Sequence, residues 1–309
     1  MVGATGCALQ RQQAVGAKRT VEASAAKMEM GPLDDHSMHM VAAPDPGASA
    51  ANGGRQGVAG IPADNNAAAE RLKASPRKGQ FVALPYEAGS KDSLMVWVSY
   101  PQAGAKAPVV IVIHDNQGLS TGARAVADQL AADGFVAIAP DLISRVRGGA
   151  SSAELSGDSV RKLIGGVTRA DRQLGVLAAA NFGMSLPVAE KRYGVVGFCW
   201  GGGESFFHAV YSSKLGAAVV YYGTPPVADS LAKIGAPVLG LYGGTDARIS
   251  STVPGTDSAM KSMHKRYEYK IFDGAGHGFM RSQDPAPNLE AAKQAWPMTV
   301  AFFRKNLGA

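Results

Sequence analysis

The sequence has only two cysteines among 309 residues, Cys7 and Cys199. So few thiols exclude a disulfide scaffold and a zinc site built from a cysteine cluster. Pairing between the two is disfavoured, because a disulfide needs two closely placed, correctly oriented Cα positions and Cys7 lies in a distant polar leader. Cys199 is therefore expected to be a free thiol.

The chain also lacks a long apolar run and a dense basic block. No apolar run is long enough to span a membrane, so no transmembrane segment is expected. The formal net charge of +6 is dispersed, without Lys/Arg blocks interleaved with aromatic residues, which argues against nucleic-acid binding. A charge of this size is compatible with the attraction of small anions but does not establish it.

The first residues, MVGATGCALQ, lack a charged stretch followed by an apolar one. No intact signal peptide is recognised there, so a cytoplasmic protein is predicted. Ala4-Thr5-Gly6-Cys7 resembles the end of a bacterial lipoprotein signal, whose cysteine becomes lipidated. A start codon placed too late would produce this pattern, which keeps a periplasmic or lipid-anchored protein as the alternative. A tail with an incidental cysteine explains the pattern equally well.

Residues 1–75 are rich in alanine, glycine and proline and poor in large apolar side chains. Such a segment buries too little surface to offset its ordering entropy, so a disordered leader is predicted. Within it, Met28–Met40 carries four methionines and two histidines, soft ligands that could bind copper. Chance clustering in a flexible tail is the competing interpretation.

Strands and helices alternate over residues 76–309, which predicts one α/β domain with a mostly parallel central sheet and helices on both faces. The apolar run Pro108–His114 is typical of a strand buried on both faces. Pro297 is expected to kink or split the final helix, which runs to Leu307. The expected strands are residues 81–86, 94–100, 108–114, 135–141, 193–199, 217–223, 236–243 and 267–274.

Cys199 stands in Gly197-Phe198-Cys199-Trp200-Gly201, a G-x-C-x-G pattern between a predicted strand and a predicted helix. This is the nucleophile-elbow pattern with cysteine in place of serine. The sharp turn leaves no room for side chains at the glycine positions, and it exposes the nucleophile in a strained backbone conformation. The following helix points its N-terminus at the sulfur, which favours the thiolate. A buried structural cysteine is the alternative.

Two further strand ends carry an acid and a histidine. Asp246 follows the predicted strand 236–243, and His277 lies between glycines after the strand 267–274. The chain order of nucleophile, acid and histidine is that of the α/β-hydrolases. His277 would then hold the thiol proton while Asp246 orients its ring. Asp273 is the rival acid, although its closeness to His277 favours a role in the turn.

The loop after the strand 108–114 reads HDNQGLS. In this fold that loop supplies one backbone N–H group to the oxyanion hole, and the residue after the nucleophile supplies the other. The two expected donors are the backbone N–H groups of Asn116 and Trp200.

Five segments in this order, HDNQGLS, APDLISR, GFCWGGG, GTDARI and GAGHGFMRS, resemble the dienelactone hydrolases (carboxymethylenebutenolidases) from about residue 78 to the end. The resemblance implies an α/β-hydrolase fold and a Cys199-His277-Asp246 triad that opens a lactone through a thioester acyl-enzyme. It also implies that no metal or organic cofactor is needed.

The resemblance further implies an arginine pair that holds the substrate carboxylate, at positions matching Arg145 and Arg281. Guanidinium groups suit this task because they bind carboxylates in a planar, bidentate manner. Asp115 stands where the family usually has a glutamate that takes part in activating the thiol. Being one methylene shorter, it reaches the sulfur directly or through water, or else the activation step or the substrate preference differs.

These observations predict a thiol-dependent hydrolase of a small anionic lactone or ester, as a monomer or small homo-oligomer. The alternatives are a general carboxylesterase or thioesterase with the same triad, a non-catalytic relative, and a metal-binding protein that uses the Met/His leader. Deletion of residues 1–75 should leave the hydrolase active and abolish metal binding. Arg147–Asp158 is the predicted mobile covering loop.

Overall fold

The computed structural model describes residues 57–102, 106–147, 151 and 155–308. The chain divides into two compact units, Met1–Met38 and His39–Ala309, and every described residue belongs to the second. Cys7 and the Met28–Met40 segment lie outside the described residues. No helix in the described part of the chain is both long and apolar enough to cross a membrane.

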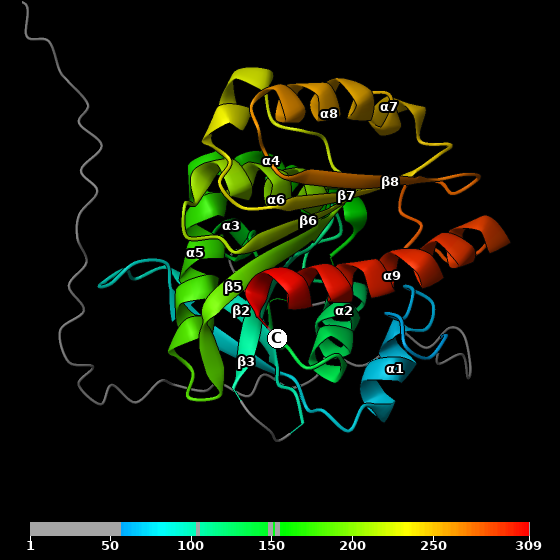
Figure 1. Cartoon of the computed structure of the whole chain (residues 1–309). Helices are drawn as coiled ribbons and strands as arrows, with labels where there is room; N and C mark the ends of the chain where they lie inside the picture. The colour runs from blue at the N-terminus through cyan, green and yellow to red at the C-terminus, as the bar shows by residue number, and fades with distance from the viewer. Residues whose placement is uncertain (1–56, 103–105, 148–150, 152–154, 309) are drawn as a thin grey trace, which may run out of the picture. The chain divides into compact units, whose positions relative to one another are not determined.

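Eight strands form one sheet in the order β1-β2-β4-β3-β5-β6-β7-β8 (Figure 1). β1 pairs antiparallel with β2, and β2 with β4, whereas the other five pairings are parallel. The prediction of a mostly parallel α/β sheet is confirmed. The strands are β1 Gln80–Pro85, β2 Ser93–Ser99, β3 Ala107–Ile113, β4 Val136–Pro140, β5 Ala189–Phe198, β6 Ala217–Tyr221, β7 Val238–Gly243 and β8 Tyr267–Phe272.

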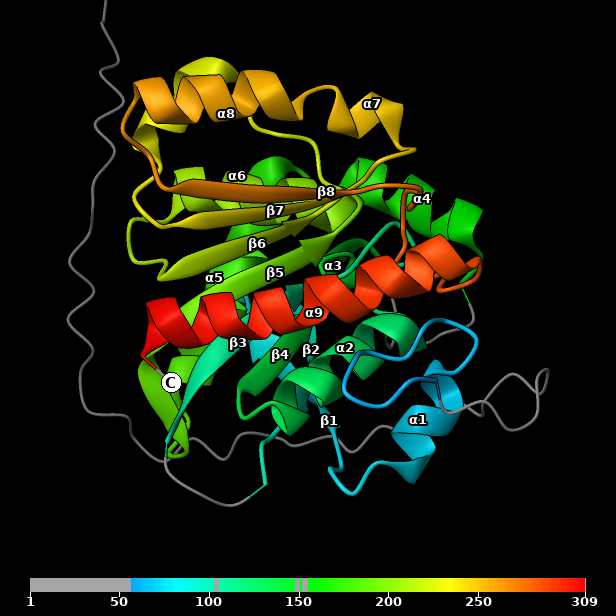
Figure 2. The ribbon, with the colours of Figure 1, turned by 45° about the vertical axis from the view of Figure 1, so that its right-hand side comes forward.

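Helices cover both faces of the sheet. Figure 2 shows α6 and α8 on one side of β5–β8, with α9 on the other side, where α2 also lies. The helices are α1 Ala68–Ala74, α2 Thr121–Ala132, α3 Ser144–Arg147, α4 Gly157–Gly166, α5 Arg169–Ser185, α6 Trp200–Tyr211, α7 Ala247–Ser250, α8 Val253–Ser262 and α9 Ala286–Leu307, with the 3-10 helix η1 at Ala228–Lys233.

The central strand β3 shows why the sheet is buried on both faces. All of its residues are buried. Successive side chains of a strand point to opposite faces, so Val110 and Val112 pack in the α2/α9 core while Val109 and Ile111 pack in the α5/α6 core. The apolar run that predicted this strand therefore serves two cores, and it fixes the carboxyl end of β3 at the centre of the sheet.

Pro297 does not split the last helix, contrary to one of the two outcomes predicted for it. α9 continues from Ala286 to Leu307 with Pro297 inside it. Trp296 and Phe303 are buried in the core on either side of this proline. Their packing holds the helix together although proline removes one backbone hydrogen bond.

The prediction of a disordered leader is wrong for residues 57–75. Ala67 and Ala68 are buried against α2, and Ile61 is buried in the core shared with α9. Small alanine side chains let helices α1 and α2 approach closely, so this segment packs despite its low hydrophobicity. The expectation for residues 1–56 lies outside the described residues.

This packing changes the expected effect of an N-terminal deletion. Removing residues 1–75 takes away the buried Ile61, Ala67 and Ala68 and should lower the melting temperature by several degrees, because apolar burial is lost. Deletion of residues 1–56 removes none of these contacts and serves as the matched control. Equal melting temperatures for the two truncations, measured by calorimetry, would contradict a stabilising role for residues 57–75.

Candidate active site

Cys199 sits at the turn between β5 and α6, directly at the helix N-cap position. Its backbone has φ 56° and ψ −114°, a conformation that side-chain-bearing residues rarely adopt. Residues held in such strained conformations are concentrated at functional sites, at a cost of about 1–3 kcal/mol each. The turn is the elbow that the G-x-C-x-G pattern predicts, and the side chain of Cys199 is partly exposed.

The two glycines of the pattern are sterically required. A Cβ atom added to Gly197 would lie 1.9 Å from the carbonyl oxygen of Gly201, and one added to Gly201 would lie 2.3 Å from that of His114. Both obstacles are backbone atoms, which cannot swing aside as a flexible side chain would. The first turn of α6 therefore rests directly against the end of β3.

The structure brings together the three side chains that the sequence predicted as a triad. The Nε2 atom of His277 lies 3.0 Å from the Cys199 sulfur, and its Nδ1 atom lies 2.5 Å from an Asp246 carboxylate oxygen. Asp246 is largely buried at the start of α7, and His277 is partly exposed. Asp273, the rival acid, is exposed, and the ring's hydrogen bonds to described residues go to Cys199 and Asp246 and not to Asp273.

The hydrogen bond to Cys199 raises the pKa of His277 above its ordinary value, and Asp246 raises it further, although burial opposes both. The charged ring is thus favoured in the fold. Because this pKa is raised on folding, protonation of His277 stabilises the protein below the unfolded-state pKa, and that contribution is lost as the pH rises through the folded-state pKa.

Asp246→Asn should lower the pKa of His277, because the substitution removes a negative charge beside Nδ1. The measurement is a titration of the His277 ring protons by NMR. Asp273→Asn is the matched control, since it removes an exposed carboxylate four positions before the histidine that is not among the hydrogen-bond partners of its ring. An unchanged pKa of His277 in Asp246→Asn would show that Asp246 does not stabilise the protonated ring.

The expected oxyanion donors, Asn116 and Trp200, both line the cavity that contains Cys199. Trp200 is the first residue of α6, where backbone N–H groups have no partner within the helix. Among the described residues, neither Asn116 nor Trp200 donates its backbone N–H to another group. Both N–H groups are thus available to a bound oxygen.

Asp115 contacts Arg281 instead of the thiol. One carboxylate oxygen lies 3.1 Å from the Arg281 guanidinium, and the other accepts the backbone N–H of Gln117 at 2.8 Å. Arg281 also reaches the side-chain oxygen of Asn116 at 3.4 Å. Within the described residues, the only hydrogen bond to the Cys199 sulfur comes from His277. No contact in this structure supports the predicted thiol-activating role of Asp115.

Arg145 does not lie where the family resemblance implies. Its guanidinium is held by Asp92 at 2.8 Å and Asp171 at 2.6 Å, over the ring of Tyr86, and it does not line the cavity at Cys199. The expectation that Arg145 binds the substrate carboxylate therefore does not fit this structure. Two of its three guanidinium nitrogens already donate to carboxylates from distant parts of the sequence.

Three other arginines line this cavity, whose volume is about 430 Å³. Arg172 lies 3.5 Å from the buried carboxylate of Glu204, which offsets part of its charge. Arg169 and Arg248 are exposed and form no salt bridge with a described carboxylate. The cavity beside the thiol is therefore positively charged.

Tyr222 is a further cavity residue that sequence reasoning missed. It follows β6 with φ 39°, and its ring centre lies 5.0 Å from that of His277. Burial raises the pKa of Tyr222 well above its ordinary value, and Asp115 adds to the effect, so its hydroxyl stays protonated. Its place at the carboxyl end of a parallel strand was the available signal, as it was for the triad residues.

Part of the predicted covering loop, Arg147–Asp158, lies outside the described residues, namely 148–150 and 152–154. Of the described part, Arg147 and Ser151 both bind the buried carboxylate of Asp141. These contacts hold Arg147 and Ser151 at the end of β4.

Comparison with known proteins gives a consistent result. The family model described as "Dienelactone hydrolase family" matches residues 95–307. A Salmonella typhimurium protein named "Putative carboxymethylenebutenolidase" is 30% identical over 229 residues, which cover 69% of this chain and 83% of that protein. A Bradyrhizobium protein named "Probable 2-oxo-3-(5-oxofuran-2-ylidene)propanoate lactonase" is 30% identical over 234 residues, which cover 70% and 91% of the two chains.

Among solved structures, the "Putative Dienelactone Hydrolase" from Klebsiella pneumoniae is similar to this chain with a TM-score of 0.65. The two are 26% identical, and the match covers 74% of this chain and 99% of that one. The likeness therefore extends over nearly the whole of a solved relative.

Proposed function

The chain belongs to the dienelactone hydrolase family and is a hydrolase of that type, and on this premise we propose that it opens a small anionic lactone or ester through Cys199, His277 and Asp246. The observation that carries the proposal is the 3.0 Å contact between the Cys199 sulfur and Nε2 of His277, whose Nδ1 atom is hydrogen-bonded to the Asp246 carboxylate. This is the arrangement of nucleophile, base and orienting acid.

The first half of the reaction forms an acyl-enzyme. His277 holds the thiol proton on Nε2, and the Cys199 thiolate attacks the ester carbonyl carbon to form a C–S bond. Two electrons of the C=O bond move to its oxygen, which the backbone N–H groups of Asn116 and Trp200 stabilise. When the carbonyl re-forms, the C–O single bond of the lactone or ester breaks, and the leaving oxygen takes the proton from Nε2 of His277.

The second half hydrolyses the thioester. His277, now neutral, takes a proton from a water molecule whose oxygen attacks the thioester carbonyl. Collapse of the second oxyanion breaks the C–S bond and returns the electron pair to sulfur, which restores the thiolate beside the protonated ring. The sum is the addition of one water to one ester, and Asp246 holds the ring in place throughout.

The arginines that line the cavity at Cys199 support an anionic substrate. Arg169 and Arg248 line the cavity without a salt bridge to a described carboxylate, so they are the groups that would hold the substrate's carboxylate. They take the place expected of Arg145. The Bradyrhizobium relative carries the name of a lactonase whose substrate is a propanoate, an anionic lactone.

A general carboxylesterase or thioesterase is the second candidate, and one observation favours it. Both arginines that the family resemblance implies are paired with carboxylates, Arg145 with Asp92 and Asp171, and Arg281 with Asp115. An enzyme whose arginines are neutralised in this way would have less need for an anionic acyl group.

Hydrolysis of a carboxylate-bearing dienelactone and of neutral p-nitrophenyl acetate by the full chain separates the two candidates. The proposal expects a higher kcat/KM for the dienelactone, and Arg248→Ala should reduce that value about tenfold or more while changing the neutral ester little. A preference for the neutral ester, or an equal loss on both substrates, would favour the general esterase.

A further inference from the structure

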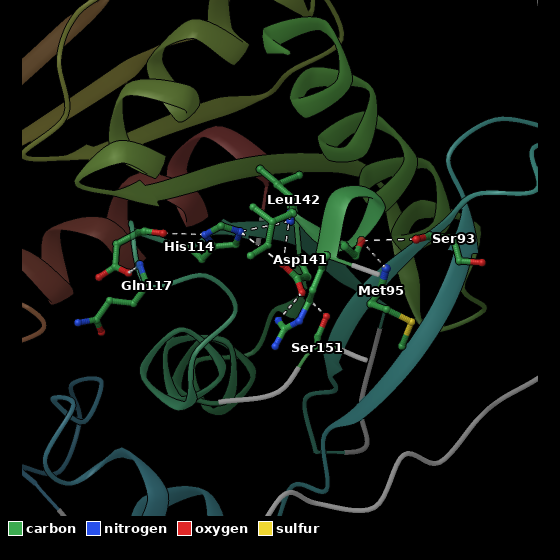
Figure 3. Close-up of polar contacts among 11 residues, drawn as sticks. Ser93, Met95, His114, Gln117, Asp141, Leu142 and Ser151 are labelled. Carbon is green, nitrogen blue, oxygen red and sulfur yellow. Dashed lines mark hydrogen bonds and ion pairs between the residues drawn. The ribbon is translucent and has the colours of Figure 1, made fainter. Parts of the chain in front are cut away.

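His114 directly follows β3, whose residues are all buried, and it is itself completely buried. Its Nδ1 atom lies 2.8 Å from the carbonyl oxygen of Asp115, and its Nε2 atom accepts the backbone N–H of Leu142 at 3.2 Å. A carbonyl only accepts and a backbone N–H only donates, so in these two contacts Nδ1 is the donor and Nε2 the acceptor. Figure 3 shows the ring held between Leu142 and the loop that carries Gln117.

The carbonyl of Asp115 and the N–H of Asn116 belong to one peptide unit. This unit is planar and trans, so its C=O and N–H bonds point in opposite directions. A donor that fixes the carbonyl therefore also fixes the direction of the N–H. His114 and the N–H of Gly118, at 3.2 Å, together hold that carbonyl, and Asn116 faces the cavity beside Cys199.

His114 also contacts the residue that provides the second donor. Its ring stacks on the side chain of Trp200, with centres 5.4 Å apart and planes inclined by 23°. On its other side, the Nε2 atom of His114 lies 3.9 Å from the buried carboxylate of Asp141, which accepts hydrogen bonds from Arg147 and Ser151 (Figure 3). The His114 ring thus accepts the Leu142 N–H through Nε2. It also contacts the Asp115–Asn116 peptide and Trp200, the two parts of the chain that provide the oxyanion donors.

We propose that His114 is a positioning residue that sets the direction of the Asn116 N–H and the place of Trp200, and so builds the oxyanion hole. The inference rests on the proposed function, because it requires these two N–H groups to bind the reaction's oxyanion. His114 does not line the cavity at Cys199 and both its nitrogens are engaged, so it acts only through its neighbours.

The test uses a reaction that needs the oxyanion hole and one that does not. Hydrolysis of p-nitrophenyl acetate develops an oxyanion, whereas alkylation of Cys199 by iodoacetamide displaces iodide at a saturated carbon and develops none. His114→Phe keeps an aromatic ring against Trp200 but loses the donor to Asp115. His114→Asn keeps a donor close to the position of Nδ1 but loses the ring.

Removal of a whole oxyanion donor costs about 10²–10³-fold in kcat. Because Gly118 still holds the Asp115 carbonyl, His114→Phe should lower kcat for the ester by about 10–100-fold, with alkylation within about twofold of the wild type. His114→Asn should recover part of this loss. His208→Phe is the matched control, since it removes a buried histidine whose two hydrogen bonds go to Tyr193 and Gln173 and not to the Asp115 peptide.

Two results would overturn the proposal. One is a kcat for His114→Phe within about threefold of the His208→Phe value at similar melting temperatures. The other is a parallel fall of hydrolysis and alkylation, which would assign His114 to general support of the fold. Neither result touches the proposed function, which instead fails if hydrolysis persists in Cys199→Ala.

Discussion

Replacement of Cys199 by alanine is expected to remove hydrolysis of both the dienelactone and the aryl ester, with a loss of at least about 10⁴-fold in kcat. The sulfur is the atom that forms the acyl-enzyme, and His277 bonds to it at 3.0 Å. The melting temperature should change by only a few degrees, because a small, partly exposed side chain is shortened by one atom. Steady-state kinetics and calorimetry on the full chain measure both quantities.

Cys199→Ser supplies the sharper comparison. It keeps the size of the side chain, but a hydroxyl is a much weaker acid than a thiol and needs stronger base assistance. We expect a folded protein that turns over slowly and is no longer alkylated by iodoacetamide at position 199, as read by mass spectrometry of the peptide that contains this position, because Cys7 is still present. Substantial turnover by Cys199→Ala would remove the cysteine from the mechanism, whatever the serine variant does.

The second large effect is expected at Gly201. A methyl group there would lie 2.3 Å from the carbonyl oxygen of His114 and 2.5 Å from that of Ile113, and neither backbone atom can turn away. Gly201→Ala should therefore lower the free energy of unfolding by about 3 kcal/mol or more. It should also displace the end of β3, which carries the oxyanion loop.

Gly203→Ala is the matched control for this prediction because it lies in the same turn of α6. A Cβ at Gly203 would approach Thr224 only to 3.4 Å, an ordinary contact. Alanine in a helix interior is more stable than glycine by about 0.5–1 kcal/mol, so this variant should be neutral or slightly stabilised. Denaturant unfolding of both variants gives the comparison, and similar stabilities would refute the steric argument for the elbow.

The sequence by itself determined the strands of the α/β sheet and the three residues Cys199, Asp246 and His277 that meet at its edge. Apolar, β-branched runs such as Pro108–His114 record burial on both faces of a sheet, and the eight expected strands are all present. The glycines around Cys199 indicate a turn that has no room for side chains at these positions. The chain order of Cys199, Asp246 and His277 then sufficed to select the acid that meets the histidine, because parallel strands bring their carboxyl ends to one edge.

Only the tertiary structure decided which charged side chains face the thiol. Arg145 is held by Asp92 and Asp171, which lie 53 and 26 positions away along the chain, and Asp115 is held by Arg281. Ion pairs of this kind depend on distances between segments that no local pattern records.

The same limit explains residues 57–75 and His114. An alanine-rich segment has the composition of a disordered one, and its burial depends on a second helix close enough to receive small side chains. A histidine after a strand carries no mark of the peptide it orients or of the ring on which it stacks. Sequence patterns indicate the local conformation of the backbone, whereas the partner of each polar side chain depends on how segments that are distant in the sequence pack together.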